Sequence, residues 1–313
     1  MKPYFSIIIP LYNKEKHIKA TLESVLNQSY TNFEIIIIND GSTDNSEIIV
    51  SKIQDPRIQI YTTKNKGVSH ARNFGISKSK SPYIVLLDAD DIWKPNHLEH
   101  LKQMNEAFPN CGMYATAYVK RKYGKIFKAI FKALPKDENW TGIINHYFES
   151  TLANSIASGS SVMIPKNVFN NIGDFNLKYN SGEDTDMWIR IAINYPVAFT
   201  NKVSVIHNMD AINKITNYKL SNRQHIDIDV YEKYCENTPF LKQYLDLNRA
   251  SIALQYKLEG KQKLAKNVLK HLDYNNLTVA QQSILKMPSV MIKFLYEFRN
   301  LLQQLQFDFR LFR

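Results

Sequence analysis

Short apolar runs alternate with stretches of helical spacing along the first third of the chain. In runs such as 33–38 nearly every side chain is aliphatic or aromatic, which is typical of strands buried on both faces of a parallel sheet. Between the runs, apolar residues recur every three or four positions, as Ile18, Leu22 and Val25 do, and this spacing predicts helices. The expected order is strand 5–9, helix 15–27, strand 33–38, helix 42–53, strand 57–62, helix 68–77 and strand 82–87.

This alternation predicts a doubly wound α/β fold whose ligands bind outside the carboxyl ends of the strands. Beyond residue 91 the pattern is looser. There we expect strands at 111–119, 156–164 and 197–207 and a helix at 185–195. From about residue 222 the spacing is helical to the end, with breaks at Pro239, Gly260 and Pro288, and a helical hairpin is expected around Gly260.

Three carboxylates, Asp88, Asp90 and Asp91, follow the expected strand 82–87 within four residues. Buried carboxylates are costly unless they are paired or bind a metal, so these belong at the strand end rather than in the core. A hard divalent cation carrying a phosphorylated substrate would be held there. A solvated turn is the alternative, and the apolar strand in front favours the cation site. An EF-hand is excluded, because Ile92 and Trp93 replace an oxygen ligand and an essential glycine.

Composition and charge limit the class of protein. The chain is 44% hydrophobic and 22% charged, which is ordinary for a folded protein with a sizeable core. Its two cysteines, Cys111 and Cys235, give no disulfide framework and favour a reducing compartment. The sequence shows neither a secretory signal pattern nor an apolar window long enough to span a bilayer. We therefore expect a cytoplasmic protein.

The formal net charge of +11 is concentrated toward the C-terminus, where residues 211–313 hold 16 Lys and Arg against nine Asp and Glu. A basic tail indicates an anionic partner, a membrane surface or nucleic acid, unless its charges lie on solvated helix faces. Residues 291–313 predict an amphipathic helix whose apolar face contacts a membrane, a partner or its own domain. Residues 120–136, with seven basic side chains, form either an interfacial helix or a hairpin turning at Gly124, and the hairpin is favoured.

Four clusters of residues lie at the ends of expected strands or in the loops that follow them, and a fifth lies far downstream. They are Ile9-Pro10-Leu11-Tyr12-Asn13, Asn39-Asp40-Gly41-Ser42-Thr43-Asp44, Asn65 to Gly75, Asp88-Ala89-Asp90-Asp91 and Gly182 to Trp188. In this order and spacing they closely resemble the inverting family-2 glycosyltransferases with the glycosyltransferase-A fold. The resemblance covers roughly residues 4–210. It implies a Rossmann-like, doubly wound mixed sheet in a catalytic domain over 1–215, followed by a helical C-terminal region over 216–313.

The resemblance assigns the nucleotide to the first three clusters. Pro10 and Tyr12 match positions that line the base and ribose. Asp40 matches the carboxylate that reads the base edge, and a group that only accepts hydrogen bonds suits the N3–H of uracil. Arg72 would hold phosphate or ribose oxygens from the start of a short helix, with a surface salt bridge as the alternative. Asn65, in the same loop, is placed with the nucleotide.

The fourth cluster is implied to hold the metal. Asp90 matches the ligand that joins Mg²⁺ or Mn²⁺ to both phosphates, so that the cation neutralises charge on the leaving group. Asp88 would lie against ribose or sugar, and Asp91 would hold the neighbouring site residues in place without contacting the metal itself. His207, at the end of the last expected strand, is a candidate third ligand or diphosphate contact, with a structural histidine as the alternative.

The fifth cluster is implied to supply the catalytic base, Asp184, which would take the proton of the acceptor hydroxyl. We expect Glu183 and Asp186 to raise its pKa by like charge. The alternative is a purely structural role, in which these acidic residues lie in the first turn of a helix and are stabilised by its macrodipole. Both interpretations can hold together. Trp188 is either an apolar platform for the sugar or part of the core.

Together these features predict a metal-dependent inverting glycosyltransferase that moves sugar from a nucleotide sugar, most simply a UDP-sugar, to a glycan or lipid-linked acceptor in surface-polysaccharide or glycoconjugate assembly. The Q-x-x-R-W motif and membrane spans of processive synthases are absent from the sequence, which favours single additions. The tail suggests peripheral contact with an anionic membrane on its cytoplasmic face, or oligomers through the C-terminal helices, and no nucleic-acid partner is expected.

Two alternatives are weighed against this interpretation. A nucleotidyltransferase of related fold needs a glycine-rich basic loop directly after the first strand, where this chain has Pro10 to Asn13. A non-catalytic nucleotide-sugar-binding protein would not need both Asp90 and Asp184.

Overall fold

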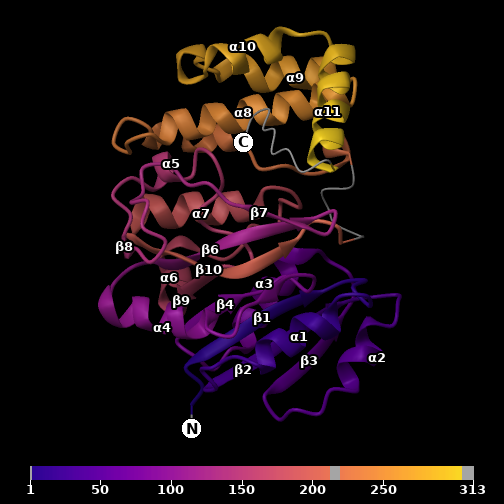
Figure 1. Ribbon diagram of the computed structural model, residues 1–313, viewed down its shortest axis with the longest axis vertical. Helices are drawn as coiled ribbons and strands as arrows, with labels where there is room; N and C mark the ends of the chain where they lie inside the picture. The colour runs from indigo at the N-terminus through magenta and orange to yellow at the C-terminus, as the bar shows by residue number, and fades with distance from the viewer. Residues whose placement is uncertain (1, 212–218, 305–313) are drawn as a thin grey trace.

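The computed structural model describes residues 2–211 and 219–304, with a central sheet covered by helices and a further layer of C-terminal helices above it (Figure 1). Up to residue 211 the elements are β1 (Phe5–Leu11), α1 (Ile18–Leu26), β2 (Phe33–Asp40), α2 (Ser46–Ser51), β3 (Ile58–Thr63), α3 (Val68–Lys78), β4 (Tyr83–Leu86), β5 (Ile92–Trp93), α4 (His97–Ala107), β6 (Met113–Lys122), β7 (Lys125–Lys128), β8 (Thr141–Ile143), α5 (Tyr147–Ser150), β9 (Val162–Pro165), α6 (Lys166–Ile172), α7 (Glu183–Asn194) and β10 (Val197–Asn208). From residue 219 they are η2 (Leu220–Asn222), η3 (Ile228–Tyr234), α8 (Leu241–Leu258), α9 (Gln262–Val268), η4 (Leu269–His271), η5 (Tyr274–Asn276), α10 (Val279–Lys286) and α11 (Ser289–Gln304).

Within the described residues the strands form one mixed sheet in the order β3-β2-β1-β4-β9-β6-β10-β5, with β7 paired to β6 and β8 to β10. β1 is parallel to β2 and β4, and β2 is parallel to β3. β9 lies antiparallel between β4 and β6, so β6 and its parallel neighbour β10 again point the same way as β4. The carboxyl ends of β1, β2, β3, β4 and β10 therefore meet at one edge, and the mixed sheet expected from the resemblance is confirmed.

Alternate residues of β1 fill two cores, one on each face of the sheet. Ile7 and Ile9 belong to a core with Leu22 of α1, while Ile8 belongs to a second core with Ala71 of α3. All three isoleucines are fully buried. Burial on both faces is why the strand sequences are continuous apolar runs rather than alternating ones.

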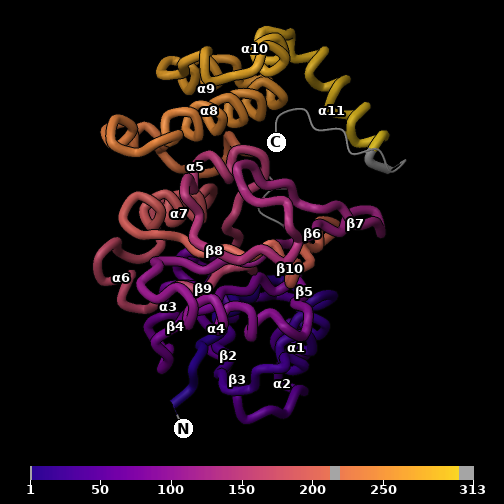
Figure 2. Tube along the Cα trace, turned by 60° about the vertical axis from the view of Figure 1, so that its left-hand side comes forward, coloured from indigo at the N-terminus to yellow at the C-terminus, as the bar shows by residue number. Residues whose placement is uncertain are grey.

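The C-terminal helices pack on one another rather than extending the sheet (Figures 1 and 2). α8 and α9 form the expected hairpin around Gly260, whose φ of +75° suits glycine. On α8 the fully buried Arg249 donates to Asp246 at 2.8 Å and to Asp229 of η3, which ties the helices to the segment before them. α11 contacts α8 and runs downward from α10 on the right of Figure 2.

Three expected elements are much shorter than their sequence patterns predict, and the strand expected at 82–87 loses one residue at each end. The helix expected at 15–27 begins only at Ile18, and that expected at 42–53 shrinks to Ser46–Ser51. The loops before these two helices bind each other instead of joining the helices. For example, the Asp44 carboxylate accepts from Glu15 N at 3.0 Å. The strand expected at 156–164 forms only from Val162, because residues 158–161 make a turn closed by Ser161 N to Ser158 O at 3.1 Å.

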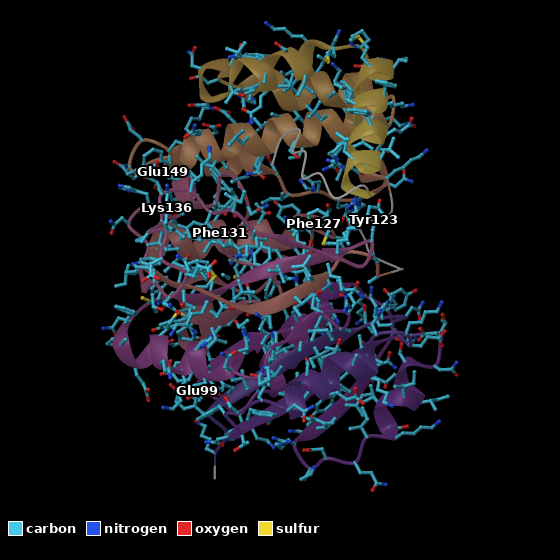
Figure 3. All side chains as sticks on the ribbon, viewed as in Figure 1. Glu99, Tyr123, Phe127, Phe131, Lys136 and Glu149 are labelled. Carbon is cyan, nitrogen blue, oxygen red and sulfur yellow. The ribbon has the colours of Figure 1, made fainter. Side chains whose placement is uncertain are left out.

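Residues 119–128 form the hairpin that the sequence favours for the basic segment 120–136, and this segment contains no helix. β6 pairs antiparallel with β7 around Tyr123 and Gly124, where φ is +52° and +69°. Figure 3 shows Tyr123, Phe127 and Phe131 spread along this segment beneath the C-terminal helices. Phe131 packs against both cores. Within the described residues, no helix is both long and apolar enough to cross a bilayer.

Candidate functional site

The loops that leave β1 and β2 are bonded to each other at the shared edge of the sheet. Asn13 N donates to Ser42 Oγ at 3.1 Å and Thr43 N donates to Asn13 Oδ1 at 2.8 Å. Pro10, the penultimate residue of β1, is half-buried, and Tyr12 directly follows the strand with 41% of its surface exposed. These two residues stand at the strand edge where ligands of open sheets bind.

Asp40, the last residue of β2, holds the loop between β3 and α3. It is 3% exposed, and its carboxylate accepts from the backbone N–H of Lys66 at 2.9 Å and of Gly67 at 2.8 Å. Gly41 follows with φ +71°, and a side chain on it would lie 2.8 Å from Asn65 N. Glycine suits this turn, and it lets the exposed Asn65 lie directly against residue 41.

The central feature of the site is Arg72, which the structure buries in α3 with 2% exposure. Its guanidinium donates to Asp184 Oδ1 at 2.5 Å and to Asp88 Oδ1 at 3.1 Å, and it lies 3.8 Å from Glu183 Oε1. Arg72 is therefore neither at the helix start nor in a surface salt bridge, the two expectations from sequence. It joins the turn after β4 to the first turn of α7.

The carboxyls around Arg72 have raised pKa values. Burial raises the pKa of Glu183 to about 7, and the charge of Asp184 adds to this. Burial also raises the pKa of Asp184, against the opposing effect of Arg72 and with a further contribution from Asp88. The Asp184 side chain keeps 32% of its surface exposed, so it can reach a solvent-borne hydroxyl.

The like charge beside Asp184 does not come from Asp186, contrary to the sequence expectation. Asp186 faces the other side of α7, where it binds Arg190 at 2.7 Å and accepts from Tyr231 of η3 at 2.6 Å. Trp188 is also turned inward, with 2% exposure within the core. It is a core residue and not a platform for the sugar.

The buried Asp91 pairs with the half-buried His207 at the end of β10. His207 Nδ1 lies 2.5 Å from Asp91 Oδ2, and its Nε2 lies 2.9 Å from Ser158 Oγ. Asp91 also accepts from Ser160 Oγ at 2.7 Å and from the backbone N–H of Asn208 at 3.0 Å. Burial would raise the pKa of Asp91, but His207 and these donors hold it below its ordinary value.

The segment 158–161 and Lys14 also contact the site, although the sequence assigns a role to neither; it only places the small residues of 156–164 in a buried strand near the site. Ser160 Oγ accepts from Asp88 N at 3.0 Å, and a side chain on Gly159 would lie 2.7 Å from Arg72 Nη2. The run of small residues was the available signal, since such residues let a backbone pass closely. Lys14 Nζ lies 2.9 Å from Asp90 Oδ2, and Asp90 is 6% exposed, so the carboxylate is buried and paired rather than solvated.

Oxygen ligands for a divalent cation are present at Asp88 and Asp90. Over residues 2–211 and 219–304, no three His, Cys, Asp or Glu side chains gather closely enough to hold a metal by themselves. Mg²⁺ is commonly bound by one or two carboxylates together with substrate phosphates. The donor set therefore fits a cation completed by a phosphorylated ligand.

The chain is similar in sequence to a known protein family and in fold to solved structures. A family model described as "Glycosyl transferase family 2" matches residues 6–173. An uncharacterized glycosyltransferase of Rickettsia bellii is 38% identical over 191 residues, covering 60% of this chain and 26% of that protein. Glycosyltransferase GlyG of Streptococcus pneumoniae is 42% identical over 106 residues, covering 33% of this chain and 35% of that protein. The chain thus spans about a quarter to a third of the length of these curated relatives.

Among solved structures, that of S. aureus TarS 1-349 in complex with UDP-GlcNAc resembles this chain with a TM-score of 0.62 at 15% sequence identity. The match covers 90% of this chain and 86% of that chain. At this level of identity the likeness shows the fold, including the mixed sheet followed by C-terminal helices.

Proposed function

Because this chain belongs to glycosyltransferase family 2, we propose that it transfers a sugar from a UDP-sugar to a hydroxyl group of a glycan or lipid-linked glycan, with inversion at the anomeric carbon. The observation that carries the proposal is Arg72, which joins Asp88 at 3.1 Å to Asp184 at 2.5 Å. One guanidinium thus links the strand-end carboxylate to the predicted base. The UDP-GlcNAc bound to the similarly folded TarS supports a uridine donor.

In the proposed reaction the acceptor oxygen attacks the anomeric carbon opposite the diphosphate. The new C–O bond forms as the bond to the diphosphate breaks, and the acceptor proton passes to Asp184. Arg72 would keep Asp184 oriented and ionised until that moment. Glu183 Oε2, which is buried and has no hydrogen-bond partner among the described residues, would gain one from a sugar or acceptor hydroxyl.

The donor nucleotide is proposed to lie across the loops after β1, β2 and β3. Pro10 and Tyr12 would line the base and ribose, with Asp40 and Asn65 at the base edge. Asp40 already accepts two backbone N–H groups, one on each carboxylate oxygen. Its Oδ1 also accepts from Thr63 Oγ1 at 3.3 Å, so the lone pair that remains for the N3–H of uracil is on Oδ2. The two backbone hydrogen bonds from Lys66 and Gly67 also support a role for Asp40 in shaping the loop that carries Asn65.

Asp90 is proposed as the main ligand of Mg²⁺ or Mn²⁺, with Asp88 beside it. A bound cation would neutralise the charge that builds up on the leaving UDP. His207 stays a candidate ligand, because Asp91 holds its Nδ1 in the way that carboxylates orient metal-binding histidines. To bind a metal through Nε2, His207 would first have to give up the hydrogen bond between Nε2 and Ser158 Oγ.

Asp90→Asn is expected to weaken UDP binding in the presence of Mn²⁺ by at least about tenfold, or about 1.4 kcal/mol. The amide keeps the size of the side chain but lacks the charge that holds a hard cation. Calorimetric titration with and without Mn²⁺ measures this. Glu23→Gln, which removes one carboxylate from an exposed pair with Lys19 on α1, is the control. Unchanged Mn²⁺-dependent affinity in Asp90→Asn would refute the metal assignment.

We place the catalytic domain at 1–215 and a helical region at 216–313, supported by the end of the sheet at Asn208 and the helices from Leu220 onward. The reaction is assigned to the cytoplasm, within surface-polysaccharide or glycoconjugate assembly. Two free cysteines, Cys111 and Cys235, support a reducing compartment.

The outer face of α11 is proposed to contact an anionic membrane that carries a lipid-linked acceptor. Met291, Phe294, Phe298 and Leu301 are each at least 45% exposed and lie three or four residues apart on the helix. The predicted stripe continues through Leu305, Phe309 and Phe312, which lie outside the described residues. The basic excess of the tail suits anionic headgroups, each Lys or Arg contributing about 1 kcal/mol near such a surface.

Replacing both Phe294 and Phe298 by Gln is expected to remove the protein from anionic vesicles in co-sedimentation, because the apolar face is lost. Ile48→Gln on α2, with Ile48 53% exposed, is the control and should leave vesicle binding unchanged. A double variant that instead converts an oligomer into a monomer would assign the stripe to a subunit interface.

A further inference from the structure

Each carboxylate of the turn after β4 is paired with a different cationic or ionisable side chain. The three partners come from separate parts of the chain. The pairs are Asp88 with Arg72 at 3.1 Å, Asp90 with Lys14 at 2.9 Å and Asp91 with His207 at 2.5 Å. A cation arriving alone would therefore find Asp90, its proposed main ligand, already paired with the ammonium of Lys14.

Lys14 differs from a mobile surface lysine. Its backbone N–H donates to Ser46 Oγ at 2.8 Å, and its carbonyl accepts from His17 and Ile18 at the start of α1. Its side chain is only 12% exposed, and that of Asp90 is 7% exposed. The backbone is thus fixed so that the ammonium reaches the carboxylate from a largely buried position, where such a pair is screened little by salt.

We propose that Lys14 and a divalent cation compete for Asp90. In the ligand-free protein Lys14 holds the carboxylate, and when a cation binds Asp90 together with the nucleotide sugar, the ammonium turns to the diphosphate. A lysine ammonium is a compact charge on a flexible stem and is a common phosphate ligand. The cation and the nucleotide then bind together, and each binds weakly alone.

The proposal rests on the proposed function and extends it from the metal ligands to the residue that controls them. Removing the ammonium should have opposite effects on two ligands. Mn²⁺ alone should bind more tightly, because its competitor for Asp90 is gone. UDP with saturating Mn²⁺ should bind less tightly, because the diphosphate loses a cationic partner.

The test measures Mn²⁺ binding without nucleotide, from the electron paramagnetic resonance signal of free Mn²⁺, in the full-length protein. Lys14→Met is expected to bind Mn²⁺ about tenfold more tightly than the wild type, and UDP in saturating Mn²⁺ about tenfold more weakly. Lys16→Met, at an exposed neighbouring position, removes the same charge and should change neither. Lys14→Arg keeps a cation beside Asp90 and should retain the weak Mn²⁺ affinity.

Equal Mn²⁺ affinity in Lys14→Met, Lys16→Met and the wild type would overturn the competition. The same holds if Lys14→Met and Lys14→Arg bind Mn²⁺ equally tightly. The variant Asp90→Asn distinguishes failure of the lysine proposal from failure of the proposed function. If the wild type binds UDP with Mn²⁺ and Asp90→Asn does not, the metal assignment stands even where the lysine proposal fails. A wild type that binds no UDP would overturn both.

Discussion

Asp184→Asn is expected to lower the rate of sugar transfer by about 10²–10⁴-fold while UDP-sugar affinity stays near that of the wild type. The amide oxygen can still accept from Arg72, now 2.5 Å from Asp184 Oδ1, so the local geometry should persist. The amide cannot take the proton of the acceptor hydroxyl. Single-turnover transfer and calorimetric donor binding, measured on the same preparation, separate the two effects.

The pH dependence provides an independent check on this base. Burial raises the pKa of Asp184 above its ordinary value, and a base works only when it is ionised. The wild-type rate should therefore rise with pH through the acidic range, and this limb should disappear in Asp184→Asn. Glu183→Gln is the matched variant, since the pKa of Glu183 is also raised, to about 7. If Asp184→Asn transferred sugar at nearly the wild-type rate, another group would have to be the catalytic base, and Glu183 would be the first candidate.

Arg72→Met is expected to lower the free energy of unfolding by about 3–5 kcal/mol at pH 8, the usual cost of removing one partner from a buried ion pair. It should also abolish transfer. Asp88, Asp184 and Glu183 all lie within 4 Å of the guanidinium and would be left without this cation. The matched control is Arg57→Met at the more exposed pair with Asp55, which should cost about 1 kcal/mol or less.

The stability deficit of Arg72→Met should shrink as the pH falls. Without Arg72 the pKa values of Glu183 and Asp184 rise further above those of the unfolded chain. Groups with raised carboxyl pKa values destabilise the fold at high pH, and protonation relieves this as the pH drops through the folded-state pKa. Urea unfolding at pH 8 and pH 5.5 measures the change. An equal deficit at both pH values would assign the effect to lost packing, such as the contact of Arg72 with Phe175 at 5.1 Å.

The strand ends could be predicted because runs such as 33–38 are short, mostly apolar and rich in β-branched residues, which is typical of strands buried on both faces of a sheet. Polar residues after them must then lie at one edge, and this places Asp88 and Asp90 there, whereas the role of Asp40 is implied by the family resemblance. Helix lengths failed where side chains bind a neighbouring loop, as Asp44 binds Glu15 N. Such contacts depend on which loops become neighbours, and spacing along the chain does not reveal that.

The pairing within the site could not be predicted for the same reason. Arg72 and Asp184 are 112 residues apart, and their contact depends on how α7 packs against α3. The direction of Asp186 depends on Tyr231, from a segment that showed only helical spacing. Lys14 carried no sequence signal, because a lysine in a loop is ordinarily solvated. Its partner became visible only when the loops after β1 and β4 were placed side by side.

The most direct measurement of the central claim is release of nucleotide from a panel of UDP-, GDP-, CDP- and dTDP-sugars, with Mn²⁺ and with water or a soluble glycan as acceptor. We predict UDP release from one or more UDP-sugars, with the product sugar in the anomeric configuration opposite to that of the donor, and its loss in Asp184→Asn. Binding of a UDP-sugar without any release would contradict the catalytic assignment and favour a non-catalytic binding protein. A product that keeps the donor configuration would contradict the single displacement proposed for Asp184.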